Sequence, residues 1–378
     1  MLGLLAVILL SGAGVWLANR KGSYVGSQLV ALADGAEGYQ RAEGPVPLAF
    51  PETLGPHPGF QTEWWYYTGN LETAGGRHFG YQLTFFRRAL APPAERQERE
   101  SAWAADQVYM AHFALTDVQA GRHQAFERFS REAAGLAGAQ AGPYRVWLED
   151  WSVEETTEGT VRMRAAQAGV GLDLVLSDAK GPIFHGDQGY SQKGPDPGNA
   201  SYYYSLTRLI TSGTVQAGGE TFEVSGLSWM DQEFSTSGLA PGQVGWDWFS
   251  IQLDDGSELM VFQLRREDGS RDPFSSGTFI APDGSSRHLD QADFEIRVEE
   301  TWRSRTTGAV YPARWTLSVP REGLRLAIEP YLGDQELTLS YAYWEGAVRV
   351  EGERAGRAVA GNGYVEMTGY AGSMRGQF

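Results

Sequence analysis

Apolar and polar residues alternate with a period of two along most of this chain. Phe79, Tyr81, Leu83 and Phe85, for example, fall on one face of a strand, and the residues between them fall on the other. Similar short runs, separated by Glu-Gly or Asp-Gly turns, recur in both halves of the chain. This pattern predicts antiparallel β-structure, because tight turns connect antiparallel neighbours. The other runs are Tyr144–Leu148, Val161–Ala165, Leu172–Leu176, Phe294–Val298, Trp315–Val319 and Leu324–Ile328.

One stretch of the pattern is present twice. The first copy begins at Glu63-Trp64 and ends at Arg87-Arg88, and the second begins at Asp247-Trp248 and ends at Arg265-Arg266. Each copy contains an acidic residue beside a Trp, an aromatic strand, a tight hairpin, an aromatic-Gln-Leu strand and a double Arg. Because the copies start about half a chain length apart, they predict two similar β domains in tandem.

We place the domain change near the Ala217-Gly218-Gly219 turn, so that the first domain covers residues 46–220 and the second covers 221–378. Antiparallel sheets rich in aromatic residues close readily into barrels, which leaves no exposed sheet edge. Small barrels of this kind offer an apolar cavity at the mouth, large enough for one lipid-like molecule. The sequence therefore predicts an all-β protein of two barrels, each with a cavity.

Residues 1–33 have a different composition. Leu2–Leu10 is apolar apart from Gly3, small residues follow, and Asn19-Arg20-Lys21 closes the segment. We interpret this segment as a signal peptide or a short membrane anchor, with a buried N-terminal helix as the alternative. The mature protein is then expected outside the cytoplasm, in the periplasm or secreted, either free or tethered.

Charge and composition exclude several classes of function. The 378 residues include 31 Lys and Arg and 47 Asp and Glu, and the net charge of −16 argues against a nucleic-acid partner and against docking on an anionic membrane. There is no Cys, which excludes disulfides and thiolate metal sites. The six His residues are dispersed, so no metal site is predicted. The sequence has no nucleophile elbow, phosphate loop or dinucleotide fingerprint, and we expect no cofactor.

Carboxylic acids among aromatic residues are the remaining candidates for chemistry. Burial among rings raises the pKa of a carboxyl group, which can then act as a general acid near neutral pH. The faces of Trp and Tyr can stabilise a developing cation. The set suits protonation of an alkene followed by addition of water, and equally acid-promoted isomerisation or cyclisation. The candidate catalytic acids are Asp231, Glu233 and Asp247, and the candidate ligand-binding residues are Glu63, Trp64, Trp65, Tyr66, Tyr203, Trp229, Trp246 and Trp248.

A structural interpretation of the same residues stays open. The aromatic side chains can fill a barrel core, and the acids can accept hydrogen bonds from indole N–H groups or cap turns. The two double Arg pairs are then solvated strand ends or partners of these carboxylates. The polar, Gly-rich segment Phe184–Gly194 is interpreted as a loop beside a cavity rim, because such loops often carry function, or as a long ordered turn.

Several motifs resemble those of a known family. His57–Leu71 resembles the opening motif of the AttH-like and carotenoid 1,2-hydratase (hydroxyneurosporene synthase) superfamily. Gly186–Gly194, Ser201–Ser205, Trp229–Phe234 and Gly245–Phe249 fit the same family in the same order. The resemblance covers nearly all of residues 46–378, and it implies two lipocalin-like barrels in an exported protein of the kind described as a predicted secreted hydrolase.

The resemblance also implies a range of activities. Family hydratases add water to isolated isoprenoid double bonds without an organic cofactor, and other relatives are isomerases or pericyclases. Asp231 and Asp247 match the family acids, but Gln232 stands where the hydratases carry His, and Phe234 stands where they often carry Trp. These departures argue against carotenoid hydration itself.

Three hypotheses follow. The first is an exported double-barrel protein that binds a hydrophobic molecule, a lipid or an isoprenoid. The second is a cofactor-independent enzyme that uses Asp231 or Asp247 as the acid for hydration, isomerisation or hydrolysis. The third is a structural or interaction module of a membrane transport assembly. The N-terminal segment and the acidic composition suit all three hypotheses.

Overall fold

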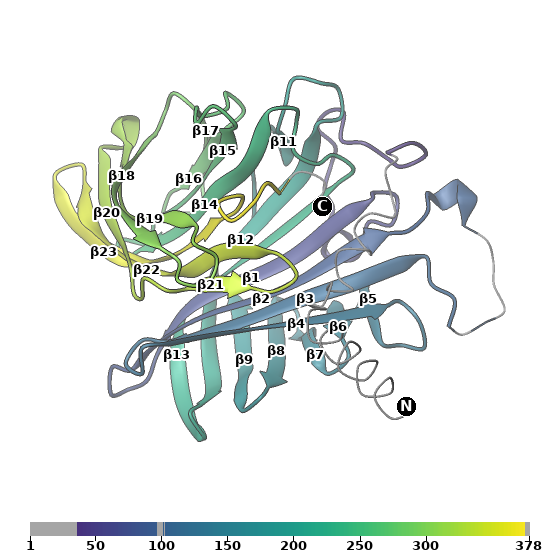
Figure 1. Ribbon diagram of the computed structural model, residues 1–378, viewed down its shortest axis with the longest axis horizontal. Coiled ribbons are helices and arrows are strands. Elements are labelled where there is room, and N and C mark those ends of the chain that lie inside the picture. The colour runs from purple at the N-terminus through teal and green to yellow at the C-terminus, as the bar shows by residue number, and fades with distance from the viewer. Residues whose placement is uncertain (1–35, 97–100, 102, 375–378) are drawn as a thin grey trace, which may run out of the picture.

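The computed structural model describes residues 36–96, 101 and 103–374. The expected leader or anchor at residues 1–33 lies outside this part. The described chain is all-β, and its two antiparallel sheets curl into near-barrels (Figure 1), as the alternation predicts. The short 3₁₀ turns are η1 (Glu52–Leu54), η2 (Pro93–Glu95) and η3 (Pro320–Glu322). Within the same part of the chain, no helix is long and apolar enough to cross a membrane.

The first sheet has 13 strands in the order β4-β3-β2-β1-β13-β12-β9-β8-β7-β6-β5, with β10 and β11 paired to β12. Neighbouring strands are antiparallel, and most of them follow one another along the chain. The strands are β1 (Thr62–Glu72), β2 (His78–Ala89), β3 (Gln107–Asp117), β4 (Arg122–Arg131), β5 (Ala137–Gln140), β6 (Arg145–Leu148), β7 (Trp151–Thr157), β8 (Thr160–Gln167), β9 (Val170–Asp178), β10 (Pro182–Phe184), β11 (Tyr190–Gln192), β12 (Ala200–Ala217) and β13 (Glu220–Ser235).

The second sheet has 10 strands in the order β17-β16-β15-β14-β23-β22-β20-β19-β18, with β21 paired to β22. Its strands are β14 (Gln243–Leu253), β15 (Glu258–Arg266), β16 (Ser276–Ile280), β17 (Ser286–Asp290), β18 (Glu295–Arg303), β19 (Val310–Val319), β20 (Leu324–Pro330), β21 (Glu336–Thr338), β22 (Ala342–Arg354) and β23 (Arg357–Met367).

The change of sheet falls later in the chain than the expected boundary after residue 220. Strand β13 pairs with β1 and β12, so the first sheet ends at Ser235 and the second begins at Gln243. The Gly218-Gly219 turn that suggested a domain change instead closes the β12–β13 hairpin. Both glycines have positive φ values, 61° and 84°, as the tight turns of two-residue hairpins require. Asp231 and Glu233 therefore belong to the first sheet.

The two copies of the sequence repeat are the hairpins β1–β2 and β14–β15, which hold equivalent places in the two sheets. In each copy the acid that opens the motif pairs with the first Arg of the double Arg that closes it. Glu63 Oε2 lies 3.0 Å from Arg87 Nε, and Asp247 Oδ1 lies 3.0 Å from Arg265 Nε. The interpretation of these arginines as partners of the acids is thus confirmed, and the acids of the repeat stabilise the hairpins that contain them.

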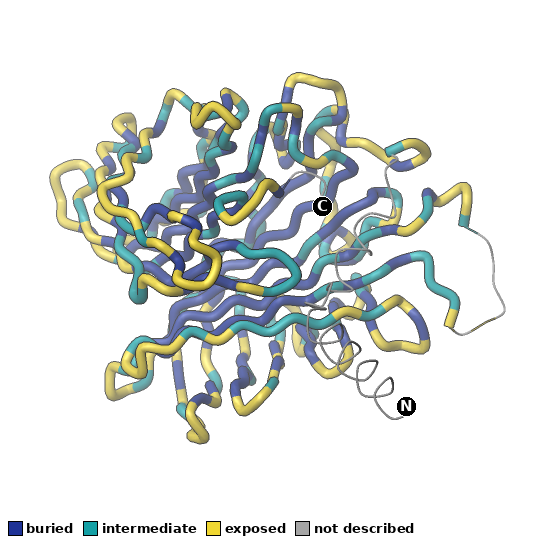
Figure 2. Tube along the Cα trace, in the orientation of Figure 1, coloured by how far each residue is buried: buried dark blue, intermediate teal, exposed yellow. Residues whose placement is uncertain are grey.

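The two sheets pack against each other through one face of each. On β1, odd-numbered residues such as Trp65 and Tyr67 belong to the core of the first near-barrel, and Tyr66 faces the second sheet. Figure 2 shows buried backbone running through the middle of the molecule, where the sheets meet. The buried cluster between the sheets consists of Tyr66, Ile183, Tyr203, Trp229, Trp248, Met260, Phe262, Leu264, Ile280, Ala347 and Tyr364.

A buried ion triad also joins the sheets. Glu258 of β15 accepts hydrogen bonds from Lys180 Nζ, at 2.6 Å, and from Arg208 Nε, and its side chain is fully buried. Lys180 follows β9, and Arg208 belongs to β12 of the first sheet. The contact fixes the second sheet on the first at one edge of their interface, and the cavity described below lies within the same interface.

Candidate functional site

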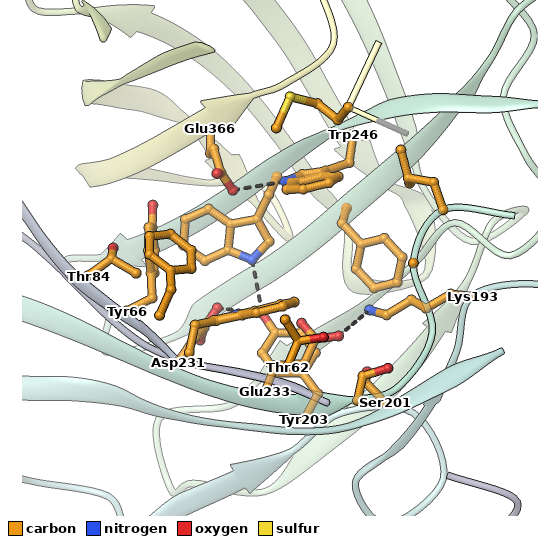
Figure 3. Close-up of a pocket in the computed structure, with 18 of the residues that line it drawn as sticks. Thr62, Tyr66, Thr84, Lys193, Ser201, Tyr203, Asp231, Glu233, Trp246 and Glu366 are labelled. Atoms are coloured by element: carbon orange, nitrogen blue, oxygen red, sulfur yellow. Dashed lines mark hydrogen bonds and ion pairs between the residues drawn. The ribbon is translucent and has the colours of Figure 1, made fainter. Parts of the chain in front are cut away.

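A cavity of about 140 Å³ lies between the two sheets. Sequence reasoning expected a cavity at the mouth of each barrel, but this space is lined by the outward-facing residues of both sheets (Figure 3). The interior of each near-barrel is instead occupied by its own buried cluster. The lining comes from β1, β2, β12 and β13 of the first sheet, from β14, β15, β22 and β23 of the second, and from Lys193, Ser237, Gly238, Leu239 and Met374.

Asp231 on β13 is the acid that the first sheet places in the cavity. It stands between Tyr66 of β1 and Ser205 of β12 in the sheet register, and its exposed fraction is 3%. Its carboxyl group accepts hydrogen bonds from Tyr203 Oη at 2.5 Å, from Trp229 Nε1 at 2.6 Å, and from Ser205 Oγ. Burial outweighs these three donors and raises the pKa of Asp231 to about 7. The group can therefore be protonated near neutral pH.

The donors to Asp231 are themselves held by residues behind them. Tyr203 Oη accepts a hydrogen bond from Trp248 Nε1 at 2.9 Å, which reaches across from the second sheet. Ser205 Oγ lies 2.6 Å from His185 Nε2, and His185 Nδ1 lies 2.8 Å from Thr278 Oγ1 on β16. Burial and the nearby Lys193 charge hold the pKa of His185 well below its usual value, so the ring is neutral. A continuous hydrogen-bonded chain thus leads from Asp231 to the second sheet.

Replacing Tyr203 by Phe is expected to raise the pKa of Asp231 above about 7. The Tyr203 hydroxyl stabilises the carboxylate, and its loss leaves the charged form with one donor fewer. The pKa can be followed by carbon-13 NMR of labelled Asp carboxyl groups in both proteins. An unchanged or lower pKa in the variant would contradict the assigned hydrogen bond.

Glu233 and Lys193 form an ion pair at the cavity, with Nζ 3.3 Å from Oε1 (Figure 3). Glu233 lies two residues after Asp231 on the same face of β13, and Lys193 follows β11 in the Gly-rich segment. Lys193 Nζ also lies 3.9 Å from the centre of the Phe262 ring. The segment expected beside a cavity rim therefore contributes a charged side chain to the lining.

Two further acids enter the cavity from the second sheet. Glu366 Oε2 accepts a hydrogen bond from Trp246 Nε1 at 2.8 Å. Burial, with a smaller contribution from the charges of Asp231 and Glu233, raises the pKa of Glu366 to about 7. Glu345 stands directly opposite Glu366 in the β22–β23 register. Burial and the neighbouring Glu366 charge raise the pKa of Glu345 well above its usual value. Figure 3 shows Glu366 and Asp231 projecting from opposite sides of the cavity.

The arrangement combines carboxyl groups that can hold a proton at neutral pH with walls of aromatic rings. Such groups can donate a proton to a bound molecule, and the ring faces can stabilise positive charge that develops on it. Of the residues described, no group of three or more His, Cys, Asp or Glu is placed to hold a metal ion.

Most of the residues predicted for the site are brought together. Trp229 stands behind the lining and donates to Asp231. Three residues face the near-barrel interiors instead: Glu63 and Asp247 pair with arginines there, and Trp65 Nε1 donates to the Leu54 carbonyl. Asp231 and Asp247, the two alternative acids, therefore do not share one cavity, because Asp231 faces the interface between the sheets and Asp247 faces the interior of the second near-barrel. The predicted residues that do line the cavity are Trp64, Tyr66, Tyr203, Asp231, Glu233, Trp246 and Trp248.

Sequence reasoning missed Glu345, Glu366, Ser205 and Lys193. Glu345 carries a signal that could have been used, because it follows Trp344 directly and interrupts an alternating strand on its buried side. Glu366 similarly lies between Val365 and Met367 at the end of an alternating run. Ser205 and Lys193 lie in segments that the sequence singles out, but nothing in the pattern distinguishes them from their neighbours, since Ser and Lys are common in strands and loops.

Comparisons with known proteins find one family and several similar folds. A family model described as AttH-like matches residues 41–370. An AttH-type protein of Nitrosomonas europaea has a solved structure with 37% sequence identity and a TM-score of 0.76, covering 86% of this chain and 99% of that one. Kievitone hydratase from Nectria haematococca has 15% identity and a TM-score of 0.65, covering 89% and 98%. CghA, solved with Sch210972, has 12% identity and a TM-score of 0.53, covering 89% and 95%. No curated protein matches the sequence.

Proposed function

This chain belongs to the AttH-like family, and we propose that it binds a hydrophobic molecule between its two sheets and acts on it by acid catalysis without an organic cofactor. The reaction class is hydration or isomerisation of a C=C bond. The observation that carries the proposal is Asp231, a buried carboxyl group with a pKa of about 7 in a cavity walled by aromatic rings. A carboxyl group buried in this way is unfavourable when charged, and acids with such perturbed pKa values cluster at catalytic sites.

The proposed step uses the residues as they lie. Asp231 gives its proton to one alkene carbon, and the π electrons form the new C–H bond. The faces of Tyr66 and Trp248, whose rings lie 5.2 Å apart, stabilise the positive charge on the other carbon. Water then adds to this carbon and loses a proton to the Asp231 carboxylate, or a neighbouring carbon loses a proton and the double bond has moved. Either route restores the acid.

Two further observations support the proposal. Kievitone hydratase, which shares the fold, is a hydratase by name. Gln232, which replaces a His of the family hydratases, points into the first near-barrel, where its Nε2 donates to Glu63 Oε1 at 2.8 Å. The departure at position 232 therefore leaves the acids of the cavity unchanged.

Exchange of carbon-bound hydrogen tests this function with simple isoprenoids as probes. The full chain is incubated in D₂O with farnesol, farnesylacetone and squalene, and each recovered probe is analysed by mass spectrometry. We expect the wild type to introduce deuterium at carbon, or to add the elements of water, in at least one probe. Asp231→Asn should do neither. A wild type that binds these probes but introduces no deuterium would contradict the proposal.

Binding alone is the second candidate function, and the mostly apolar surface of the cavity favours it. In that case the protein carries a lipid or an isoprenoid. Native mass spectrometry of the purified full chain would detect a co-purified molecule. A molecule that leaves wild type and Asp231→Asn chemically unchanged would favour the carrier over the enzyme.

Location and assembly are proposed from the sequence. The apolar segment within residues 1–33 supports export or tethering, and a place in a membrane transport assembly is the weaker alternative. Fractionation of cells that express the full chain would test export. Recovery in the cytoplasmic fraction alone would contradict it.

A further inference from the structure

Glu345 is a buried carboxyl group whose two oxygen atoms have no hydrogen-bond partner among the described residues. The side chain has an exposed fraction of 0% and lines the cavity. The Tyr66 and Tyr343 hydroxyls are near enough to lower the pKa of Glu345 slightly, against the larger effects of burial and of Glu366. Neither hydroxyl, however, makes a hydrogen bond of regular geometry to the carboxyl group.

A second polar atom at the same place is also unsatisfied. The Tyr66 hydroxyl, on a side chain 7% exposed, lies near the Glu345 carboxyl group but makes no hydrogen bond of regular geometry within the described part of the chain. Tyr66 reaches the cavity from β1 of the first sheet, and Glu345 reaches it from β22 of the second. Both line the enclosed space that Asp231 also enters, and Figure 3 shows Tyr66 and Asp231 there.

Such unsatisfied groups are informative because they are unfavourable. A buried donor or acceptor that has lost water without gaining a partner destabilises the folded state, and native proteins contain few of them. By contrast, the carboxyl groups of Asp231, Glu233 and Glu366 each have a partner from the protein. The hydrogen-bonding capacity left over in this cavity thus includes both oxygens of Glu345 and the Tyr66 hydroxyl, together with Gln82 Oε1 and Ser201 Oγ of the first sheet.

We propose that Glu345, from the second sheet, and Tyr66, from the first, together bind a neutral oxygen group of the ligand, a hydroxyl or a carbonyl. A protonated carboxyl group and a phenol each offer one donor and acceptor oxygens, which complement either group. The inference rests on the proposed function and names its substrate class. The substrate is an apolar, uncharged molecule with an oxygen group at a distance from the carbon that Asp231 protonates.

Charge excludes one alternative ligand class. Among the described residues, four carboxyl groups and one Lys line the cavity, so an anionic ligand such as a fatty acid would be repelled by each carboxyl group that is ionised, with Lys193 alone to offset the repulsion. A hydrocarbon would leave Glu345 and Tyr66 unsatisfied. An ammonium ligand would instead suit ionised carboxylates and ring faces, and the experiment below separates it from a neutral one.

Ligand binding to the full chain tests the inference with four probes that share the farnesyl skeleton: farnesene, farnesol, farnesylamine and farnesoic acid. Trp64, Trp246 and Trp248 line the cavity, so quenching of Trp fluorescence reports occupancy, and calorimetry confirms each affinity. We expect the wild type to bind farnesol about tenfold tighter than farnesene, and tighter than the amine and the acid. Glu345→Leu should lose this preference, with farnesol about tenfold weaker and farnesene unchanged or tighter.

Two variants serve as controls. Glu345→Gln keeps a donor and an acceptor in the same shape and should retain the preference for farnesol. Glu351→Leu makes the same substitution at an exposed position of the same strand and should change neither affinity. These controls separate the loss of a hydrogen-bonding group from a general effect of Leu on β22.

Four outcomes would overturn the inference. The first is equal affinity of the wild type for farnesene and farnesol, which would mean that Glu345 holds only water. The second is that the wild type binds farnesylamine most tightly, and the third is that Glu345→Leu loses affinity equally for farnesene and farnesol. The fourth is that the wild type binds none of the probes. The proposed function has a separate readout. Deuterium exchange that depends on Asp231, without a preference for farnesol, would refute this inference alone. A preference for farnesol without exchange would refute the catalytic proposal alone.

Discussion

Asp231→Asn is expected to lower turnover by about 10²- to 10⁴-fold, the usual contribution of a positioned general acid. Asn has nearly the same shape, but its amide oxygen can replace only one of the two carboxyl oxygens that accept from Tyr203 and from Trp229, and it has no acidic proton to give. The loss should therefore appear in kcat, with the affinity for the probe changed little. The measurement is the rate of deuterium incorporation into the probe that the wild type turns over.

The wild-type rate should also depend on pH in a defined direction. Asp231 must be protonated to act, so the rate should fall as the pH rises through about 7. The free energy of unfolding also depends on the protonation of Asp231. Its pKa is higher in the folded state than in the unfolded chain, so the stabilisation is complete below the unfolded value and is lost as the pH rises to about 7. The Asn variant should lack this component when urea unfolding is measured at several pH values.

Asp247→Asn is the matched control for this prediction. Asp247 is also a buried acid beside a Trp, but it faces away from the cavity and pairs with Arg265. Its replacement should reduce stability and leave the turnover of the folded protein within about threefold of wild type. Loss of turnover in Asp247→Asn with full activity in Asp231→Asn would reverse our assignment of the acid.

Glu63→Gln is expected to lower the free energy of unfolding by about 3–5 kcal/mol, because it leaves the Arg87 guanidinium buried without its anionic partner. Both side chains have an exposed fraction of 0%. Glu63 also accepts hydrogen bonds from the His57 backbone N–H, at 2.8 Å, and from Gln232 Nε2. The substitution thus weakens the end of the β1–β2 hairpin at several points. Urea unfolding at neutral pH measures the loss.

The pH dependence of this ion pair has the opposite sign to that of Asp231. Burial raises the pKa of Glu63, but the charge of Arg87 and the contacts of His57 outweigh it, and the pKa is lowered overall. The pair therefore contributes its stability above the unfolded pKa of a Glu, and this contribution is lost as the pH falls below it. Glu63→Gln should be closest to wild type in stability at acidic pH.

A double variant provides the control for Glu63. Glu63→Met with Arg87→Met replaces the whole pair by apolar side chains, and it should recover much of the stability that the single variant loses. The affinity for farnesol should be unchanged in both proteins, because Glu63 faces the near-barrel interior. A tenfold loss of affinity in a Glu63→Gln protein of normal stability would instead restore the ligand-binding role predicted from the sequence.

The fold was largely predictable because its signal is local and repeated. Alternation along runs such as Phe79–Phe85 reports which faces of a strand are buried, and the two copies of the hairpin motif report two sheets. The domain boundary was harder to predict from the sequence. A Gly-Gly turn has the same sequence whether it ends a domain or closes a long hairpin, and only the pairing of β13 with β1 distinguishes the two cases.

The candidate site was predictable only in part. Asp231, Glu233, Trp64, Tyr66, Tyr203, Trp246 and Trp248 were selected as acids and rings in family-like motifs, and they line one cavity. Glu63 and Asp247 were selected for the same reason and lie elsewhere. A shift of one residue along a strand turns the side chain to the other face of the sheet. An acid beside a Trp in the sequence is therefore near a ring, but the sequence does not tell which face of the sheet the acid occupies.

By itself, the sequence determined that this chain forms two antiparallel β domains with related hairpins, because period-two burial and turn residues are properties of short segments. Only the tertiary structure decided that the cavity lies between the sheets. It also decided that Asp231 lines this cavity together with Glu366 and Glu345, and that Asp247 does not line it. The physical reason is that both faces of each strand at this interface are buried. Alternation then identifies two faces, and only the packing of one sheet on the other decides which of them encloses a space.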